Sequence, residues 1–184
     1  LDVIKTNTRR MESLLKDMSY INKIRKKTLQ LTPKMDMFKN MAMRLEKDMK
    51  TVAEEYKKEL VFEVPDGLPL LNIDSEILVV AIEKFIENAL RYTKEDGKVT
   101  VSGSTDGSTL VIKVADNGIG ISDDDLAQLG TIYFRSDDDH VREFKGSGLG
   151  IPIAYGLLDI LGATYNVESE PDNGTTFTVR IEGM

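Results

Sequence analysis

Residues 74–93 read DSEILVVAIEKFIENALRYT, and their apolar residues recur at the three- and four-residue spacing of an amphipathic helix. Asp74 or Ser75 is expected to cap this helix, which should end near Tyr92. Most of its circumference is apolar, which leaves one polar strip formed by Lys84, Glu87, Asn88 and Arg91. An ordinary solvent-facing strip is the commoner explanation for a helix taken alone, so a functional interpretation depends on the neighbouring segments.

The segment VADNGIGIS, residues 114–122, supplies the first such neighbour. It ends a predicted strand in Asp116 and places Gly118 and Gly120 two residues apart. Glycines there let the backbone take positive φ or approach a ligand closely. A carboxylate at a strand end can accept a hydrogen bond from an exocyclic amine, a charge-assisted bond of about 1.5 to 3 kcal/mol. Turns after strands commonly have such sequences, so this segment alone is weak evidence.

The segment KGSGLGI, residues 145–151, places Gly146, Gly148 and Gly150 directly before a predicted helix. Free N–H groups at a helix N-terminus, together with the macrodipole, suit a phosphate group. The spacing differs from that of a Walker A loop, which needs Lys-Ser or Lys-Thr after its last glycine. It also differs from the dinucleotide fingerprint, whose third glycine falls one position later. Both of these phosphate-binding classes are therefore excluded.

Periodicity elsewhere predicts helices and strands that together form an α+β fold. The predicted helices span residues 1–32, where Pro33 ends the first, then 35–58 and 148–161, with a short one at 124–129. The predicted strands span residues 59–64, 70–73, 98–104, 109–116, 163–169 and 174–182. We expect a two-layer α/β sandwich: a mixed, mostly antiparallel sheet covered by helices on one face and preceded by a long helix.

Composition narrows the possible functions. The 184 residues include no cysteine, which excludes disulfides and thiolate chemistry, and a net charge of −7 argues against a general nucleic-acid binder. No apolar run approaches the roughly 18 residues that a membrane span needs. Two aspartate runs, 123–125 and 137–139, are interpreted as solvated surface rather than metal sites.

Taken in order, these segments resemble one family closely: the catalytic ATP-binding domain of two-component sensor histidine kinases. Its superfamily also holds gyrase, Hsp90 and MutL, and the resemblance implies their Bergerat-type fold. ENALRYT is similar to the N box, DNGIG to the G1 box, YFRSD to part of the F box, GSGLGI to the G2 box and NGTTF to the last glycine box. Upstream, TRRMESLLKDMSYI resembles the second helix of the dimerisation and phosphoacceptor hairpin.

The resemblance implies a role for each matching residue in binding ATP and Mg²⁺. Asn88 would bind Mg²⁺, Arg91 would reach the phosphates and Tyr92 would lie against adenine. Asp116 would accept from the adenine amine, with Thr175 assisting through a water. The remaining positions would allow close approach or form the lid and its hinge: Gly118, Gly120, Phe134, Arg135, Gly146, Gly148, Leu149 and Gly150.

Three positions depart from the family pattern. Lys84 stands where these kinases usually carry Asn and hydrolytic relatives carry Glu. Because a lysine cannot bind Mg²⁺ or activate water, we expect slow ATP hydrolysis and a direct contact from Lys84 to a phosphate, which would make it catalytic together with Asn88 and Arg91. Gly130 and Ile132 replace the usual Phe and Pro of the F box.

The chain lacks the family's acceptor segment, because its single histidine, His140, does not lie in the expected His-Glu-Leu-Arg-Thr-Pro surround. We therefore expect residues 1–32 to be the second hairpin helix and residues 33–184 the catalytic domain, with the acceptor helix absent. The implied partners are the protein's own hairpin, in a homodimer, and a response regulator, without nucleic acid. The expected location is cytoplasmic, with any membrane anchor in other parts of the protein.

Two alternatives remain open at this stage. A nucleotide-binding interaction module would bind ATP without transferring a phosphoryl group. An anti-sigma-type serine kinase of the same superfamily is disfavoured by the long N-terminal helix and by YFRSD. Phosphoryl transfer to a separate hairpin would distinguish an enzyme from a module.

Overall fold

The computed structural model describes residues 2–136 and 146–184, except for the side chains of residues 2–6, 9 and 10. It contains one five-stranded sheet in the order β2-β4-β5-β7-β6. β2 runs parallel to β4, and the other neighbouring pairs are antiparallel. The strands are β2 (Glu59–Glu63), β4 (Lys98–Asp106), β5 (Thr109–Asp116), β6 (Thr164–Glu170) and β7 (Gly174–Glu182).

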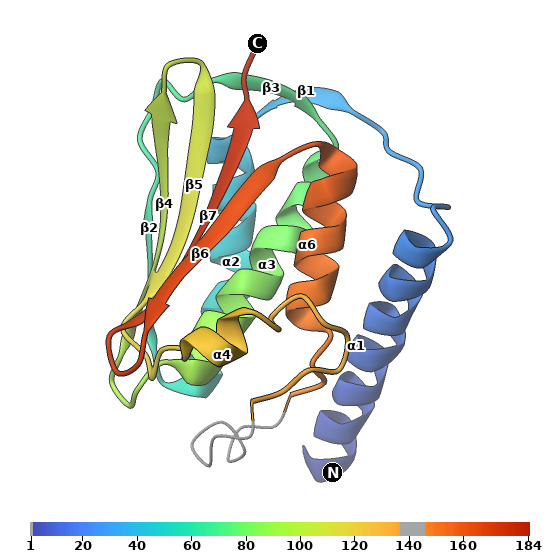
Figure 1. Ribbon diagram of the computed structural model, residues 1–184, viewed down its shortest axis with the longest axis vertical. Coiled ribbons are helices and arrows are strands. Elements are labelled where there is room, and N and C mark those ends of the chain that lie inside the picture. The colour runs from blue at the N-terminus through green and yellow to red at the C-terminus, as the bar shows by residue number, and fades with distance from the viewer. Residues whose placement is uncertain (1, 137–145) are drawn as a thin grey trace.

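Three helices cover one face of this sheet: α2 (Phe38–Tyr56), α3 (Ser75–Tyr92) and α6 (Gly150–Leu161) (Figure 1). The Phe85 ring on α3 stacks on the Phe177 ring of β7 with centroids 4.4 Å apart, so the central helix packs directly on the sheet. The observed sheet with helices on one face confirms the predicted α+β sandwich.

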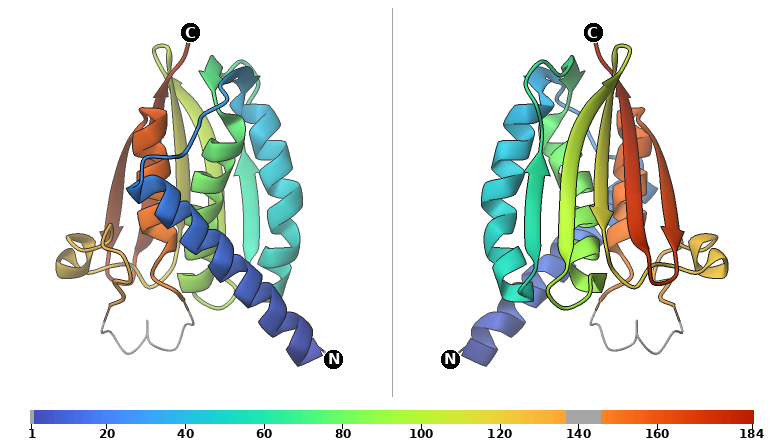
Figure 2. Two further views of the ribbon diagram at one scale, coloured as in Figure 1. Left: turned by 90° about the vertical axis from the view of Figure 1, so that its right-hand side faces the viewer. Right: turned by 90° about the vertical axis from the view of Figure 1, so that its left-hand side faces the viewer.

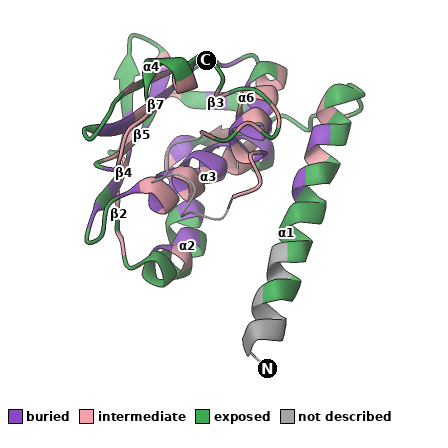
Figure 3. Cartoon of the chain, turned by 60° about the horizontal axis from the view of Figure 1, so that its bottom comes forward, coloured by how far each residue is buried: buried purple, intermediate pink, exposed green. Residues whose placement is uncertain are grey.

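The N-terminal helix α1 (Asp2–Arg25) lies outside this sandwich and crosses over α3 and α6 (Figure 2). Most of its described side chains are exposed, as Figure 3 shows by colour. A loop then leads to β1 (Lys34–Met37), which pairs antiparallel with β3 (Leu70–Ile73) in a separate two-stranded sheet. Within residues 2–136 and 146–184, no helix is both long and apolar enough to cross a bilayer.

The predicted boundaries between the first two helices were wrong. The first helix ends at Arg25, well before Pro33, and the second begins at Phe38 rather than Met35. Residues 34–37 form a strand instead, since their backbone pairs with β3, a segment more than thirty residues away. Local periodicity cannot anticipate such a partner, and a short apolar run suits either a helix or a strand.

The ends of α3 and α6 are formed by the residues that sequence indicated. Asp74 is the N-cap of α3, and its Oδ1 accepts a hydrogen bond from the Ile77 N–H at 3.2 Å. Gly162 follows α6 in the left-handed conformation, with φ of 71°. The predicted short helix at 124–129 is α4 (Asp123–Leu126), which ends three residues earlier than predicted and which Ser122 caps through its side chain. His140 lies outside the described residues.

Candidate functional site

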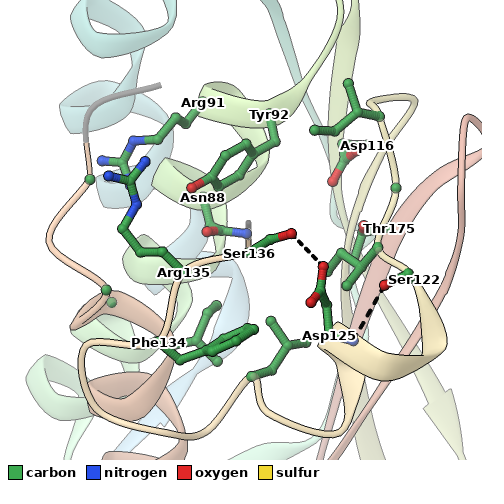
Figure 4. A pocket seen from close by; sticks show the side chains of 18 of the residues that line it. Asn88, Arg91, Tyr92, Asp116, Ser122, Asp125, Phe134, Arg135, Ser136 and Thr175 are labelled. Carbon is green, nitrogen blue, oxygen red and sulfur yellow. Dashed lines mark hydrogen bonds between the residues drawn. The ribbon is translucent and has the colours of Figure 1, made fainter. Parts of the chain in front are cut away.

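A cavity of about 430 Å³ lies between α3, the end of β5, α4 and the start of α6, within the size range of small-molecule sites. Figure 4 shows side chains from these elements pointing into it. The structure brings most of the predicted site residues to its wall. These are Lys84, Asn88, Arg91, Tyr92, Asp116, Gly120, Phe134, Arg135, Gly146, Gly148, Gly150 and Thr175.

Two predicted residues, Gly118 and Leu149, are buried beside the cavity and are not among the residues that line it. The Gly118 N–H donates to Asp116 Oδ1 at 2.8 Å, so its backbone holds the carboxylate. Leu149 is the N-cap residue of α6 and is 1% exposed. Both residues therefore hold parts of the cavity wall in place without lining it.

Asp116 forms one end of the cavity. Burial raises the pKa of its carboxyl to about 6, while hydrogen bonds from the backbone of Gly118 and Thr175 act in the opposite direction. Thr175 is opposite Asp116 in the β5–β7 ladder, and its Oγ1 is 2.9 Å from Ser169 Oγ. A fixed, partly desolvated carboxylate of this kind can accept a hydrogen bond from a ligand amine.

The loop after Asp116 is tied to the end of α3. The Ile119 N–H donates to the Tyr92 carbonyl at 3.1 Å. This bond places the end of β5 beside the last turn of α3, so that the polar strip of α3 and the carboxylate of Asp116 face one cavity. The polar strip of α3 and the segment around Asp116, each weak evidence in the sequence alone, therefore form parts of one site.

Cationic groups gather on another side of the cavity. Arg91 comes from α3 and Arg135 from the segment before residue 137, and both lie on the same side of the pocket in Figure 4. Arg91 Nε is buried and has no hydrogen-bond partner within the described part of the chain. A Cβ added to Gly146 would lie 3.1 Å from Arg91 Nη1, so the glycine leaves room for this guanidinium. Two guanidinium groups at one wall suit an anionic ligand.

The start of α6 borders the same cavity through Gly148, Gly150 and Ile151. Leu149, which precedes the helix, provides no side-chain cap. The positive end of the macrodipole of this twelve-residue helix therefore faces the cavity and adds to the attraction for an anion.

Lys84 lines the cavity but is also ion-paired with the N-terminal helix. Its Nζ lies 2.8 Å from Asp17 Oδ1 and 3.6 Å from Glu87 Oε2. Burial lowers the pKa of Lys84, but Glu87 and Asp17 outweigh this effect and the net pKa is raised. Lys84 is therefore a paired cation at the edge of the site.

Comparison with known families identifies the domain. Residues 73–183 match the family described as "Histidine kinase-, DNA gyrase B-, and HSP90-like ATPase". The chain belongs to this family. Within it, the resemblance to the catalytic ATP-binding domain of sensor histidine kinases is confirmed, because curated relatives and solved structures carry that description.

Proteins whose sequences are similar to this chain include sensor histidine kinases. An uncharacterised sensor-like histidine kinase of Rhizobium meliloti is 31% identical over 129 residues, covering 70% of this chain and 25% of the relative. SenX3, a sensor-like histidine kinase of Mycobacterium tuberculosis, is 31% identical over 135 residues, covering 73% and 33%. The chain thus spans between a quarter and a third of the length of these relatives.

Solved histidine kinases share the fold. AdeS of Acinetobacter baumannii matches with a TM-score of 0.79 at 18% identity, over 99% of this chain and 83% of that one. Full-length ShkA, solved in complex with AMPPNP, matches with a TM-score of 0.82 at 24% identity, over 95% of this chain and 36% of that one. The overlap with AdeS includes α1, so the similarity of fold extends beyond the ATPase domain.

Sequence reasoning missed Asp125 and Ser136 in this histidine kinase-like domain. Asp125 was assigned to solvated surface, but it lines the cavity and accepts a hydrogen bond from the Ser136 hydroxyl (Figure 4). The short helix that carries Asp125 was predicted, and Ser122 is its N-cap, but no local signal shows that this helix borders the cavity. Across the described ranges, no group of three or more acidic or histidine side chains is arranged to hold a metal ion.

Proposed function

We propose that this chain is the ATP-binding catalytic core of a sensor histidine kinase. It would transfer the γ-phosphoryl group of ATP to a histidine on a dimerisation hairpin, for relay to a response regulator. The observation that carries the proposal is one cavity with a carboxylate, Asp116, at one end and two guanidinium groups, Arg91 and Arg135, at another wall. Adenine presents an amine and the triphosphate presents negative charge, which matches this polarity.

At the adenine end, Asp116 would accept a hydrogen bond from the exocyclic amine, and Thr175 would assist through a water. Tyr92 lies in the same wall of the cavity and offers an aromatic face to the base. Guanine carries an oxygen where adenine carries this amine, so the Asp116 carboxylate would repel it. The site is therefore expected to select ATP over GTP.

At the phosphate end, Arg91 and Arg135 would neutralise and orient the triphosphate, and the start of α6 would add its dipole. The side chains present also fit Mg²⁺: Asn88 lines the cavity between the two ends and offers a neutral amide oxygen. Mg²⁺ is commonly held by few protein ligands together with substrate phosphates, and it supplies charge neutralisation when bound. Lys84, in our proposal, contacts the terminal phosphate when it is released from Asp17.

Transfer would break the bond from the γ-phosphorus to the bridging oxygen, releasing ADP, and would form a phosphorus–nitrogen bond to the acceptor imidazole. The contribution of this chain is positioning and charge neutralisation, which dominate phosphoryl transfer. Because Lys84 cannot act as a base toward water, hydrolysis of ATP is expected to be slow.

Residues 1–32 are proposed to be the second helix of the hairpin, and residues 33–184 the catalytic domain. In support, α1 exposes an apolar stripe formed by Met11, Leu14, Leu15 and Met18, with exposed fractions from 43% to 66%. Such a stripe suits packing in a helical bundle, as in a homodimer of the hairpin.

The test is transfer of labelled γ-phosphate from ATP to a separately supplied hairpin that carries the acceptor histidine. Label on the hairpin, stable to base and lost in acid, is the expected result. Tight ATP binding without any transfer would contradict the kinase proposal and would favour a nucleotide-binding interaction module.

Replacing Asn88 with alanine is expected to raise the Mg²⁺ concentration for half-maximal ATP binding about tenfold, which corresponds to about 1.4 kcal/mol. The reason is the loss of the amide oxygen that lines the cavity. Titration of Mg²⁺ at fixed ATP measures the effect. Asn166→Ala, an exposed asparagine on β6, is the matched control, and equal midpoints for the two variants would contradict a metal role for Asn88.

A further inference from the structure

The ion pair between Lys84 and Asp17 joins the wall of the cavity to the N-terminal helix. Both side chains are nearly buried, at 8% and 10% exposure, and the Nζ–Oδ1 distance is 2.8 Å. Among the described side chains of α1, only Asp17 and Ile21 are buried. The pair is therefore one of the buried contacts between α1 and the domain, beside the apolar contacts of Ile21 and Ile24.

Other charges around Lys84 are predominantly acidic. Glu87 Oε2 lies 3.6 Å from Nζ, and Glu83, the residue directly before Lys84, also raises the pKa of Lys84. Lys84 thus keeps its positive charge, with Asp17 as its nearest partner. Removing the carboxylate from a buried ion pair leaves the cation buried without a counter-charge, which destabilises the protein unless another anion replaces the carboxylate.

The same lysine lines the cavity, one helical turn before Asn88. A triphosphate in the cavity would bring a second, stronger anion within reach of Lys84. The Asp17 carboxylate already neutralises much of the charge that Lys84 presents and would repel a nearby phosphate, so the two anions compete for this cation.

We propose that Asp17 is a positioning residue that withholds Lys84 from the terminal phosphate, so that docking of α1 and binding of triphosphate compete for one cation. The proposal rests on the proposed function, since it needs a nucleotide in this cavity. Because coupling between two sites is reciprocal, bound ATP loosens α1, and loosening α1 tightens ATP. ADP, which lacks the γ-phosphate, is affected less.

The first measurement is the affinity for Mg·ATP and Mg·ADP by calorimetry. Asp17→Asn is expected to raise the preference for ATP over ADP about fivefold, the lower end of typical coupling between sites. Glu12→Gln removes the same charge from an exposed position on α1 and should leave the preference unchanged. In a Lys84→Met background, Asp17→Asn should have no effect on the preference. A merely structural role for Asp17 would change both affinities equally.

The second measurement follows α1 itself. The chain has no cysteine, so a spin-label pair can be attached at Met11→Cys and Lys50→Cys, both exposed positions. Asp17→Asn is expected to broaden the distance distribution without nucleotide, and Mg·ATP is expected to do so in the unsubstituted chain. Melting curves confirm that each variant is folded.

The outcomes separate the two proposals. If Asp17→Asn and Glu12→Gln bind ATP with the same preference over ADP, the proposed competition is overturned, but the proposed nucleotide site is not. Absence of nucleotide binding by the unsubstituted chain would overturn the proposed function and the competition with it.

Discussion

Asp116→Asn is expected to weaken ATP binding by about 10- to 100-fold, since a charge-assisted hydrogen bond contributes about 1.5 to 3 kcal/mol. The Asn oxygen can still accept from the Gly118 N–H, which now bonds Oδ1 at 2.8 Å, so the loop should keep its shape. Selectivity should fall with affinity, because the neutral amide no longer repels the oxygen of guanine. Calorimetric titration with ATP and GTP measures both effects.

The same substitution is expected to stabilise the protein at neutral pH. Burial raises the pKa of Asp116 from its ordinary value of 3.8 to about 6. Between these values the folded chain holds a proton that the unfolded chain has released, so this carboxyl makes folded stability fall as pH rises from about 4 to about 6. A pKa shift of this size corresponds to about 3 kcal/mol of folding free energy. Asparagine accepts weaker hydrogen bonds from the Gly118 and Thr175 backbone, so we expect a smaller net stabilisation of about 1 to 2 kcal/mol at pH 7.5.

Denaturant unfolding of the two proteins at pH 7.5 and at about pH 4 tests this sign, because the gain should vanish at the lower pH. Asp106→Asn is the matched control: it removes a carboxylate from the exposed end of β4, at the opposite end of the β4–β5 hairpin. Loss of stability together with loss of ATP binding would mean that Asp116 supports the fold rather than a ligand.

Gly174→Ala is expected to destabilise the domain by about 4 kcal/mol or more, which marks severe core disruption. Gly174 has φ of +85°, and a Cβ there would lie 2.0 Å from the Asp116 carbonyl oxygen and 3.0 Å from Asn117 Cα. These are backbone atoms of the neighbouring strand end, so relief requires the end of β5 to move away from β7. That movement would displace Asp116 and remove the nucleotide site together with the fold.

Gly107→Ala is the matched control for this prediction. Gly107 also has positive φ, +61°, but a Cβ there would meet nothing within 4 Å. It isolates the cost of the left-handed backbone, about 1 to 2 kcal/mol. Equal unfolding free energies for the two variants in denaturant titration would show that the contact with Asp116 is relieved at no cost.

Several parts of this protein follow from local sequence. The apolar period over residues 75–92, the Asp74 cap and the Gly162 ending depend on neighbours within one or two helical turns, and the structure has all three. The ordered motifs around Asn88, Asp116 and the glycines before α6 identified the family, because each preserves a short local geometry. Residue spacing alone carries such information.

Tertiary structure decided the remainder. Residues 34–37 became a strand because β3 is beside them, and Asp125 became part of the cavity because α4 folds toward Ser136. Lys84 gained its partner Asp17 from a helix 67 residues away in sequence. Each depends on contacts between distant segments, whose free energy exists only once the chain has folded, so no local pattern records them. By itself, the sequence determined the central helix α3, the cap of α3, the glycine that ends α6 and the family, whereas the fold determined which charges share one pocket.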